Sequence, residues 1–315
     1  MLTIRKRRML FWISIAVFFL LVGAVLIYSL GYRLGNGFVF EKTGGIFIKS
    51  SQVGAEIYVD GKPKKTTSYL SGGALIKNIT PGIHEVTVKL EGFWEWKKKL
   101  EVVSEEVNSK DILLVPMNPE GKILGEKPEI FEPFLKNGTL YDYENKIAKE
   151  TYSGVKKFWP LSSGKYVILG EDENFYLNKA RITNEFPTET LDALKNYPNS
   201  AFEDNDQRLV LWDGRNIDSI WLDSEDKMPL WQKGSSITVY TSPRGAIIRQ
   251  VFEYPGWADY LLIAMQNGIF ALEMNASGGQ NIAPIYKGKK PEIISIKNGK
   301  VFVLDDENYL EIILP

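Results

Sequence analysis

Residues 208–221 read RLVLWDGRNIDSIW: an apolar run, a tight polar turn and a second alternating run. An Asp-Gly pair between two such runs is a strong signal for a β-hairpin. The same organisation recurs in residues 166–177 (YVILGEDENFYL), 260–272 (YLLIAMQNGIFAL) and 301–312 (VFVLDDENYLEI), and more weakly in residues 137–143. The copies lie about 40–50 residues apart, which is the period of a four-stranded propeller blade. We therefore expect residues 129–315 to form a β domain that is built on a repeated hairpin.

The segments that precede two of these hairpins, residues 154–159 and 292–297, fit inner strands of such blades. Residues 162–167, SSGKYV, resemble the start of WD40- and TolB-like blades, although a Trp-Asp pair occurs only at Trp212-Asp213 and the Gly-His element is absent. The resemblance is thus to β-propellers as an architecture and to no specific family. Four or five units fit in this length, so an incomplete or decorated propeller and a β-sandwich both stay open. Residues 189–195 are expected to form a short helix.

Residues 45–116 show a period of two, which is typical of strands with one buried face. Residues 56–59 alternate before Asp60-Gly61, which predicts a hairpin turn, and Pro81-Gly82 predicts a second turn. In the strands that follow, one parity is apolar: Val86, Val88 and Leu90, then Trp94, Trp96, Leu100 and Val102. Residues 111–115 are expected to close the unit. The pattern predicts a small antiparallel all-β domain of about 70 residues with one buried face.

The order of these elements resembles the PEGA domain. The matching segments are residues 54–62 (GAEIYVDGK), 79–88 (ITPGIHEVTV) and 90–94 (LEGFW). The tetrapeptide that names the family is altered, since Gln52-Val53 stand where Pro-Glu would be, and Thr66-Thr67-Ser68 replace the usual Thr-Pro. The resemblance covers residues 45–116 and implies a small, non-catalytic β-sandwich module that is common in prokaryotic surface proteins. Residues 33–44 are expected to be a Gly-rich spacer and residues 117–128, rich in Pro, Gly and charge, a linker.

Residues 9–32 carry no charged side chain, and the four residues before them, 5–8, are all basic. A helix over the apolar run of about 21 residues would span about 30 Å, the thickness of a bilayer core. Because positive residues stay inside, we expect residues 1–8 to be a cytoplasmic tail, residues 9–32 a transmembrane anchor, and the bulk of the chain extracytoplasmic. The alternative is a cleaved signal peptide, but the apolar run is long for one and residues 29–31 are its only passable cleavage site.

Composition narrows the class of partner. The chain has 315 residues, of which 44% are hydrophobic, and a net charge of −1. Beyond residue 8 it holds 34 basic and 39 acidic residues, and this mildly acidic balance argues against nucleic acid as a partner. The absence of cysteine excludes disulfides and zinc sites with thiolate ligands.

The search for chemistry yields no catalytic, cofactor-binding or metal-binding residue. Carboxylates cluster at residues 171–173, 203–206 and 305–307, where hairpin turns also favour Asp and Asn. A glycosidase would pair two such carboxylates across a cleft, and a calcium site would need alternating ligands in one loop, a pattern that is absent. His84, the only histidine, is expected to be structural. The candidate ligand-face aromatics are Trp212, Trp221, Trp231 and Trp257, for which packing inside the blades is an equal alternative.

These features predict an all-β ectodomain on a single N-terminal transmembrane helix. The expected function is that of a membrane-anchored, non-catalytic binding or scaffolding protein of the cell envelope, with no cofactor and with an envelope protein or glycan as partner. Two alternatives stay open. One is an envelope-glycan hydrolase that uses carboxylates at the turns, such as Asp172, Asp206 and Asp306. The other is an extracytoplasmic sensor, for which a tail of about eight residues leaves little room for an output domain.

Overall fold

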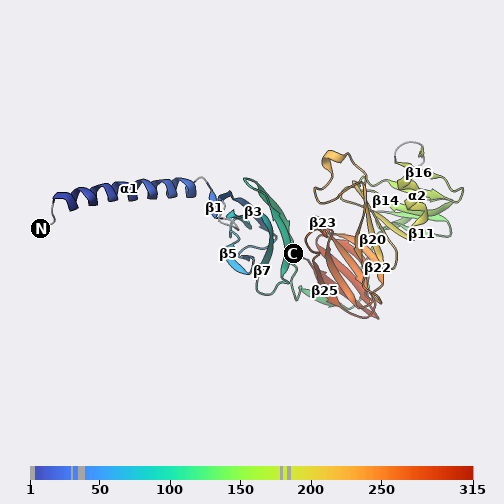
Figure 1. Ribbon diagram of the computed structural model, residues 1–315. Coiled ribbons are helices and arrows are strands. Elements are labelled where there is room, and N and C mark those ends of the chain that lie inside the picture. Colours follow the sequence, from blue (N-terminus) through green and yellow to red (C-terminus); the bar gives the residue numbers. More distant parts are fainter. Residues whose placement is uncertain (1–3, 30, 35–39, 178–179, 183–185, 315) are drawn as a thin grey trace. The chain divides into compact units, whose positions relative to one another are not determined.

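The computed structural model describes residues 4–29, 31–34, 40–177, 180–182 and 186–314. The chain divides into two compact units (Figure 1). The first unit comprises residues 1–91 and 95–114, and the second comprises residues 92–94 and 115–315.

The first unit begins with helix α1, Ile4–Ser29. Over its most apolar stretch of 18 residues the mean hydropathy is 2.8, and no other described part of the chain buries this stretch. Among the described residues it is the one helix that is long and apolar enough to cross a membrane. It starts before residue 9, so the basic residues 5–8 form its first turns, and it ends at Ser29, short of residue 32. The helix thus extends beyond the N-terminal end of the expected anchor, because basic side chains favour a helix as much as Leu does.

A short hairpin follows the helix where a spacer was expected. Strand β1, Tyr32–Leu34, pairs with β2, Phe40–Lys42. Residues 35–39 of the expected spacer lie outside the described residues.

Two sheets form the rest of the first unit. One has the order β6-β3-β9 and the other the order β5-β4-β7-β8. Their bounds are β3 Gly44–Ser50, β4 Glu56–Val59, β5 Lys62–Thr66, β6 Gly73–Ile79, β7 Gly82–Lys89, β8 Trp96–Val102 and β9 Val107–Ile112. Both sheets contribute to the buried core, for example with Ile46 and Ile48 from β3 and with Val86 and Val88 from β7. The prediction of a purely antiparallel unit is wrong, because β9 pairs with β3 in parallel.

The turn chemistry of this unit follows the sequence. Asp60 and Gly61 both have positive φ, 50° and 72°, as the central residues of a tight hairpin turn require, and this confirms the predicted turn between β4 and β5. Strand β8 alternates strictly between buried and exposed residues from Trp96 to Val102. Trp94 does not continue this strand, contrary to the prediction, and belongs to the second unit.

The described part of the second unit forms five small antiparallel sheets, four of them four-stranded. Sheet F has the order β11-β12-β13, and sheets G, H, I and E have the orders β14-β15-β16-β17, β18-β19-β20-β21, β22-β23-β24-β25 and β26-β27-β28-β10. In F the strands are β11 Phe134–Lys136, β12 Thr139–Glu144 and β13 Ile147–Ser153, and in G they are β14 Val155–Pro160, β15 Tyr166–Gly170, β16 Phe175–Leu177 and β17 Ala180–Arg181. In H they are β18 Asn199–Glu203, β19 Arg208–Trp212, β20 Asn216–Trp221 and β21 Ser236–Thr241, and in I they are β22 Ile248–Tyr254, β23 Trp257–Met265, β24 Gly268–Glu273 and β25 Ile282–Lys287. In E they are β26 Glu292–Lys297, β27 Lys300–Asp305, β28 Asn308–Ile313 and β10 Gly121–Leu124.

Each of the four hairpins that the sequence predicts forms the two middle strands of one four-stranded sheet of the second unit. The expected short helix is α2, Thr188–Asn196, and a 3₁₀ helix spans Glu225–Lys227. Just before the turns of these hairpins, the aliphatic residues Leu169, Leu211 and Ile263 are buried, but Leu304 is only half-buried. In β27, the first strand of that last hairpin, the buried positions are Val301 and Val303, on the opposite parity to Leu304.

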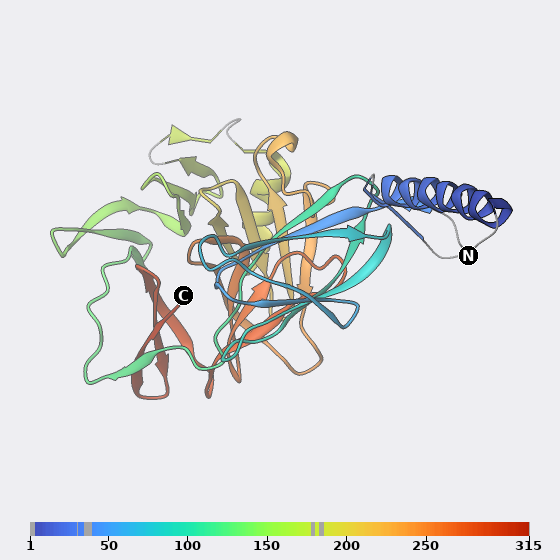
Figure 2. The ribbon, with the colours of Figure 1, turned by 90° about the vertical axis from the view of Figure 1, so that its left-hand side faces the viewer.

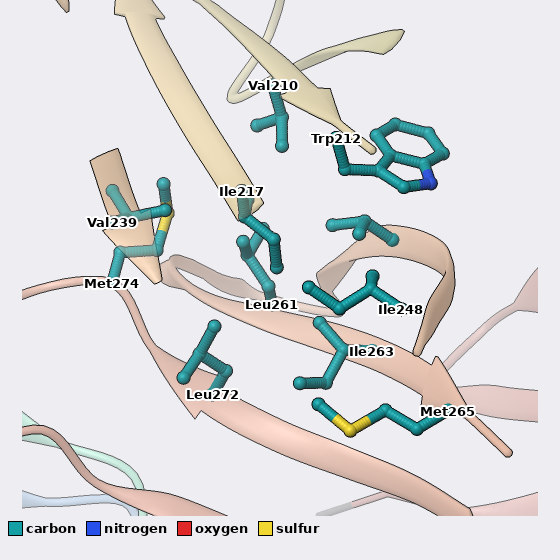
Figure 3. Close-up of a cluster of buried hydrophobic side chains, with 11 residues drawn as sticks. Val210, Trp212, Ile217, Val239, Ile248, Leu261, Ile263, Met265, Leu272 and Met274 are labelled. Carbon is teal, nitrogen blue, oxygen red and sulfur yellow. The ribbon is translucent and has the colours of Figure 1, made fainter. Parts of the chain in front are cut away.

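Sheets F, G, H and I of the second unit pack against one another in chain order through three apolar clusters. Leu140 and Val155 join sheets F and G in one apolar cluster with Ile168, and Leu169 joins sheets G and H in a second cluster with Leu211. A third cluster joins sheets H and I (Figure 3), and its residues are Val210, Trp212, Ile217, Val239, Ile248, Val251, Leu261, Ile263, Met265, Leu272 and Met274. Neighbouring residues of one middle strand thus enter different clusters, because successive side chains of a strand point to opposite faces.

Strand β10 lies within residues 117–128, where a linker was expected. Gly121 pairs with Ile312 and Leu124 with Tyr309, so β10 is the edge strand of sheet E beside the C-terminal strand β28 (Figure 2). The part of the second unit that comes first in the sequence is therefore hydrogen-bonded to the part that comes last.

Candidate functional site

The four candidate tryptophans occupy different environments. Trp212 is 8% exposed and belongs to the cluster between sheets H and I, where its Nε1 donates to the carbonyl of Arg249 at 3.4 Å. This position fits the packing alternative. Trp221 and Trp231 are brought together by one side chain, Arg208, whose guanidinium carbon lies 5.6 Å from the centre of each ring.

Arg208 is the first residue of β19 and is only 1% exposed. Strand pairing places Trp221 of β20 directly opposite it, and the loop between β20 and β21 brings Trp231 to it. Its Nη1 donates to the carbonyl of Ala258 at 2.5 Å. A cation between two aromatic rings gains from the negative faces of both, most of all where water is excluded.

Carboxylates surround this guanidinium at a greater distance. Nη2 of Arg208 lies 3.6 Å from Asp259 and 3.8 Å from Asp204. Neither Nη2 nor Nε of Arg208 makes a hydrogen bond within the described part of the chain. Asp259 also accepts a hydrogen bond from Nε1 of Trp231 at 3.1 Å, so it links the loop of Trp231 to sheet I.

Two further carboxylates, Glu203 and Glu253, lie where the first strands of sheets H and I end. Glu253 accepts a hydrogen bond from the backbone N–H of Asp204 at 2.5 Å, and this bond joins the two sheets. Burial, followed by the charge of Glu253, raises the pKa of Glu203 to about 8. Burial also raises the pKa of Glu253.

The turn that carries Trp257 approaches the same place, because Ala258 and Asp259 both contact Arg208. The ring of Trp257 meets Tyr260 edge to face, with 5.8 Å between the ring centres. We call Glu203, Asp204, Arg208, Trp221, Trp231, Glu253 and Asp259 the Arg208 cluster. It fastens two turns and a long loop together, which is a stabilising role, and its own guanidinium fills the space between the two rings. Sequence reasoning missed Arg208 and Glu253, because a charged residue at the end of a strand usually faces solvent, and it noted Glu203 only as part of the acidic cluster at residues 203–206.

The three carboxylates that were candidates for glycoside hydrolysis do not converge. Asp172 lies in the turn between the second and third strands of sheet G, and Asp306 in the corresponding turn of sheet E. Asp206 lies in a turn between the first and second strands of sheet H, which is the opposite end of a sheet, and it accepts hydrogen bonds from Ser162. Hydrogen bonds from Tyr176 and Asn174 lower the pKa of Asp172 to about 2, so it cannot serve as an acid at neutral pH.

His84 has the structural surroundings that were expected. Its Nδ1 lies 2.6 Å from the carboxylate of Asp60 and its Nε2 lies 2.8 Å from the carbonyl of Thr80. Among the described residues, no group of three or more His, Cys, Asp or Glu side chains is placed to hold a metal ion. The two ring nitrogens thus connect the β4–β5 turn, through Asp60, with the β6–β7 connection, through Thr80.

A cavity of about 650 Å³ lies in the second unit, beside the edge strand β10. Strands β10, β25 and β28 supply most of its walls, and residues 117–119 and Trp94 supply the rest. Nε1 of Trp94 donates to the carbonyl of Pro284 at 3.1 Å, which fixes the ring in the wall. A smaller cavity of about 430 Å³ lies between sheets F and G and includes Tyr152, Glu171, Asp172 and Tyr176. Both volumes fall in the range of small-ligand and peptide-side-chain sites.

Comparison with known proteins adds to the first unit alone. A search of curated proteins gave no match. A solved structure, Kluyveromyces lactis Hsv2, is similar with 12% sequence identity over 85% of this chain and 74% of that chain, at a TM-score of 0.32. A similarity this weak carries no argument about the fold. Residues 43–118 match the PEGA domain family, which confirms the resemblance expected for residues 45–116.

Proposed function

We propose that this chain is a single-pass membrane protein whose β units lie outside the cytoplasm and act as a non-catalytic binding or scaffolding module of the cell envelope. The observation that carries the proposal is the long apolar helix, uncharged over residues 9–29, in front of two β units. Helix α1 is 26 residues long, contains no acidic residue and starts with the basic residues 5–8. Lys and Arg on one flank favour a cytoplasmic N-terminus, which would place residues 33–315 outside.

The binding role is supported by the organisation of the second unit. Binding residues are found most often on loops and edges over a rigid scaffold. Sheets F, G, H and I pack against one another in chain order through their apolar clusters. We infer a propeller-like ring, in which sheet E follows sheet I and the pairing of β10 with β28 joins the two ends of the unit. Sheet F, with three strands, would be the incomplete member of this ring.

The partner that we propose is an envelope protein or glycan. The second unit holds 22 basic and 29 acidic residues, which disfavours nucleic acid. The cavity beside β10 offers a partner both an apolar wall and polar strand edges. The separated positions of Asp172, Asp206 and Asp306 favour binding over hydrolysis, since a glycosidase needs two carboxyls on either side of one bond.

The topology is tested by adding a protease to intact cells that produce the full chain. Almost the whole chain should be digested from outside. Recovery of a protected fragment of most of the chain would overturn the proposed orientation. The binding role is tested by crosslinking the full chain in its own membranes and comparing the captured proteins and glycans with those captured by α1 and its tail fused to an unrelated domain. Equal capture by both chains would overturn it.

A further inference from the structure

The outer edge of β10 is free. The N–H of Ile313 donates to the carbonyl of Glu120 at 2.8 Å. In an antiparallel pair the hydrogen-bonded positions alternate, so Lys122 and Leu124 turn their backbone groups towards β28, whereas Gly121 and Ile123 turn theirs away. No described strand pairs with β10 on that side. The edge therefore presents backbone donors and acceptors in the spacing of a strand.

Exposed apolar side chains lie beside this edge. The side chain of Ile123 is 72% exposed and that of Met117 is 44% exposed, and both line the 650 Å³ cavity. The wall on the other side of the cavity comes from β25, through Pro284 and Tyr286. A free edge beside an apolar cavity matches the way in which an added strand is recognised, since main-chain bonds give affinity and pockets accept alternate side chains.

The charge at this place differs from that of the whole unit. Lys122 and Lys287 line the cavity, and Lys289 and Lys290 follow in the chain. The one acidic residue in the lining, Glu311, is paired with Lys300 at 3.1 Å and lies 3.7 Å from Lys122. Lys287 forms no ion pair with a described residue. Asp305 lies close by, because it accepts hydrogen bonds from Tyr286 and from the N–H of Lys289. The cation that remains available at the cavity is therefore Lys287, which is complementary to an acidic side chain of a partner.

We propose that the free edge of β10 binds an extended, acidic segment of a partner protein as an added strand, with alternate apolar side chains of that segment in the cavity. The inference rests on the proposed binding function and names the class of partner. A glycan is disfavoured here, because a sugar chain does not reproduce the alternating N–H and C=O groups that a strand edge pairs with.

The test uses the full chain in lipid nanodiscs and a display library of random eight-residue peptides. The wild-type chain should enrich peptides that alternate apolar and acidic residues. Ile123→Pro removes the outward N–H without touching the bonds to β28, and proline is tolerated at strand edges. It should weaken binding of the enriched peptides at least about tenfold, which corresponds to about 1.4 kcal/mol. The matched control Ile123→Val keeps the N–H and should stay within about threefold.

A second variant leaves the backbone intact. Lys287→Glu should weaken the acidic peptides by about threefold or more and shift the enrichment towards basic peptides, since it reverses a charge at the cavity. Circular dichroism should show the same fold for all variants. No enrichment, or peptides that bind Ile123→Pro as well as wild type, would overturn strand addition. If envelope glycans crosslink to the wild type and to Ile123→Pro alike, the proposed binding function stands and only the added strand is rejected.

Discussion

Strands of the two units are buried in different ways. In β8 of the first unit, buried and exposed residues alternate along the whole strand, so only one face is covered. In β19 of the second unit, all five residues of Arg208–Trp212 are buried. A strand in a two-sheet sandwich buries side chains in one core, on one of its faces, whereas a middle strand in a row of stacked sheets buries side chains in two cores, one on each face. The repeat in the second unit is thus a repeat of contacts between neighbouring sheets as well as a repeat of hairpins.

The largest expected effect tests this contrast directly. Leu211 packs between sheets G and H, and its neighbour Val210 packs between sheets H and I. Leu211→Ala should lower the free energy of unfolding by about 2–5 kcal/mol, and Val210→Ala by at least about 1 kcal/mol, because both leave cavities. In β8, Leu100→Ala should be similarly costly, but Glu101→Ala should change stability by less than about 0.5 kcal/mol. Urea unfolding of the full chain in detergent measures all four, and a neutral Val210→Ala would reject two-sided burial.

The Arg208 cluster gives the next effect in size. Arg208→Met removes the guanidinium between Trp221 and Trp231 and its hydrogen bond to Ala258. We expect a loss of about 2 kcal/mol from the second unit, together with a change in tryptophan emission, because both rings lose their cationic neighbour. The exposed Arg215 offers a matched control, since Arg215→Met should alter neither property. Unchanged emission in Arg208→Met would show that the two rings do not depend on this contact.

The second unit should lose stability as pH rises. Glu203 has a folded pKa of about 8 against an ordinary value of 4.5, so between these values the folded chain keeps a proton that the unfolded chain releases. Stability then falls with increasing pH, with a slope of at most about 1.4 kcal/mol per pH unit. Glu203→Gln should flatten the dependence and stabilise the unit at pH 8 more than at pH 5. Thermal unfolding across this range measures it, and equal slopes for both chains would contradict the assignment.

The stability of the first unit should depend on pH in the opposite direction, and by a smaller amount: it should fall as pH decreases. Burial would raise the pKa of Asp60, but hydrogen bonds from His84 and from the N–H of Glu85 outweigh it, so the pKa lies below 3.8. The stability from this ionised carboxylate is present above about pH 4 and is lost as pH falls through the folded pKa. At neutral pH, Asp60→Asn should cost about 0.5–1 kcal/mol, since the side chain is half exposed. If the unfolding transitions of the two units shift in the same direction with pH, the predicted difference between the units is wrong.

The features that the sequence predicts well are local. The turn at Asp60-Gly61 and the four hairpins depend on a few adjacent residues, and the period-two alternation of β8 is visible in the sequence of the strand itself. The PEGA resemblance combines several such signals over residues 45–116 and is confirmed. By contrast, β3 and β9 are far apart in the sequence, and no turn residue indicates that they pair in parallel.

The candidate site was harder to predict for the same reason. Strand β10 is four residues long, mostly exposed and surrounded by Pro, Gly and charge, so by itself it has the composition of a linker. Only its partner β28 makes it a strand. Likewise Arg208 is defined by a cross-strand tryptophan and by a loop residue, Trp231, whose position depends on the whole arrangement of sheets H and I.

The pairing of β10 with β28 also fixes an order of events during synthesis. The strands of the two sheets in the first unit all lie between residues 44 and 112, so that unit can complete its hydrogen bonding while the rest of the chain is still on the ribosome. Sheet E cannot do so, because Gly121 must wait for Ile312. Until the last strand emerges, both edges of β10 stay unpaired, and contacts between such distant residues are slow to form. The interval before that closure is when the nascent second unit is most exposed to aggregation and most in need of chaperones.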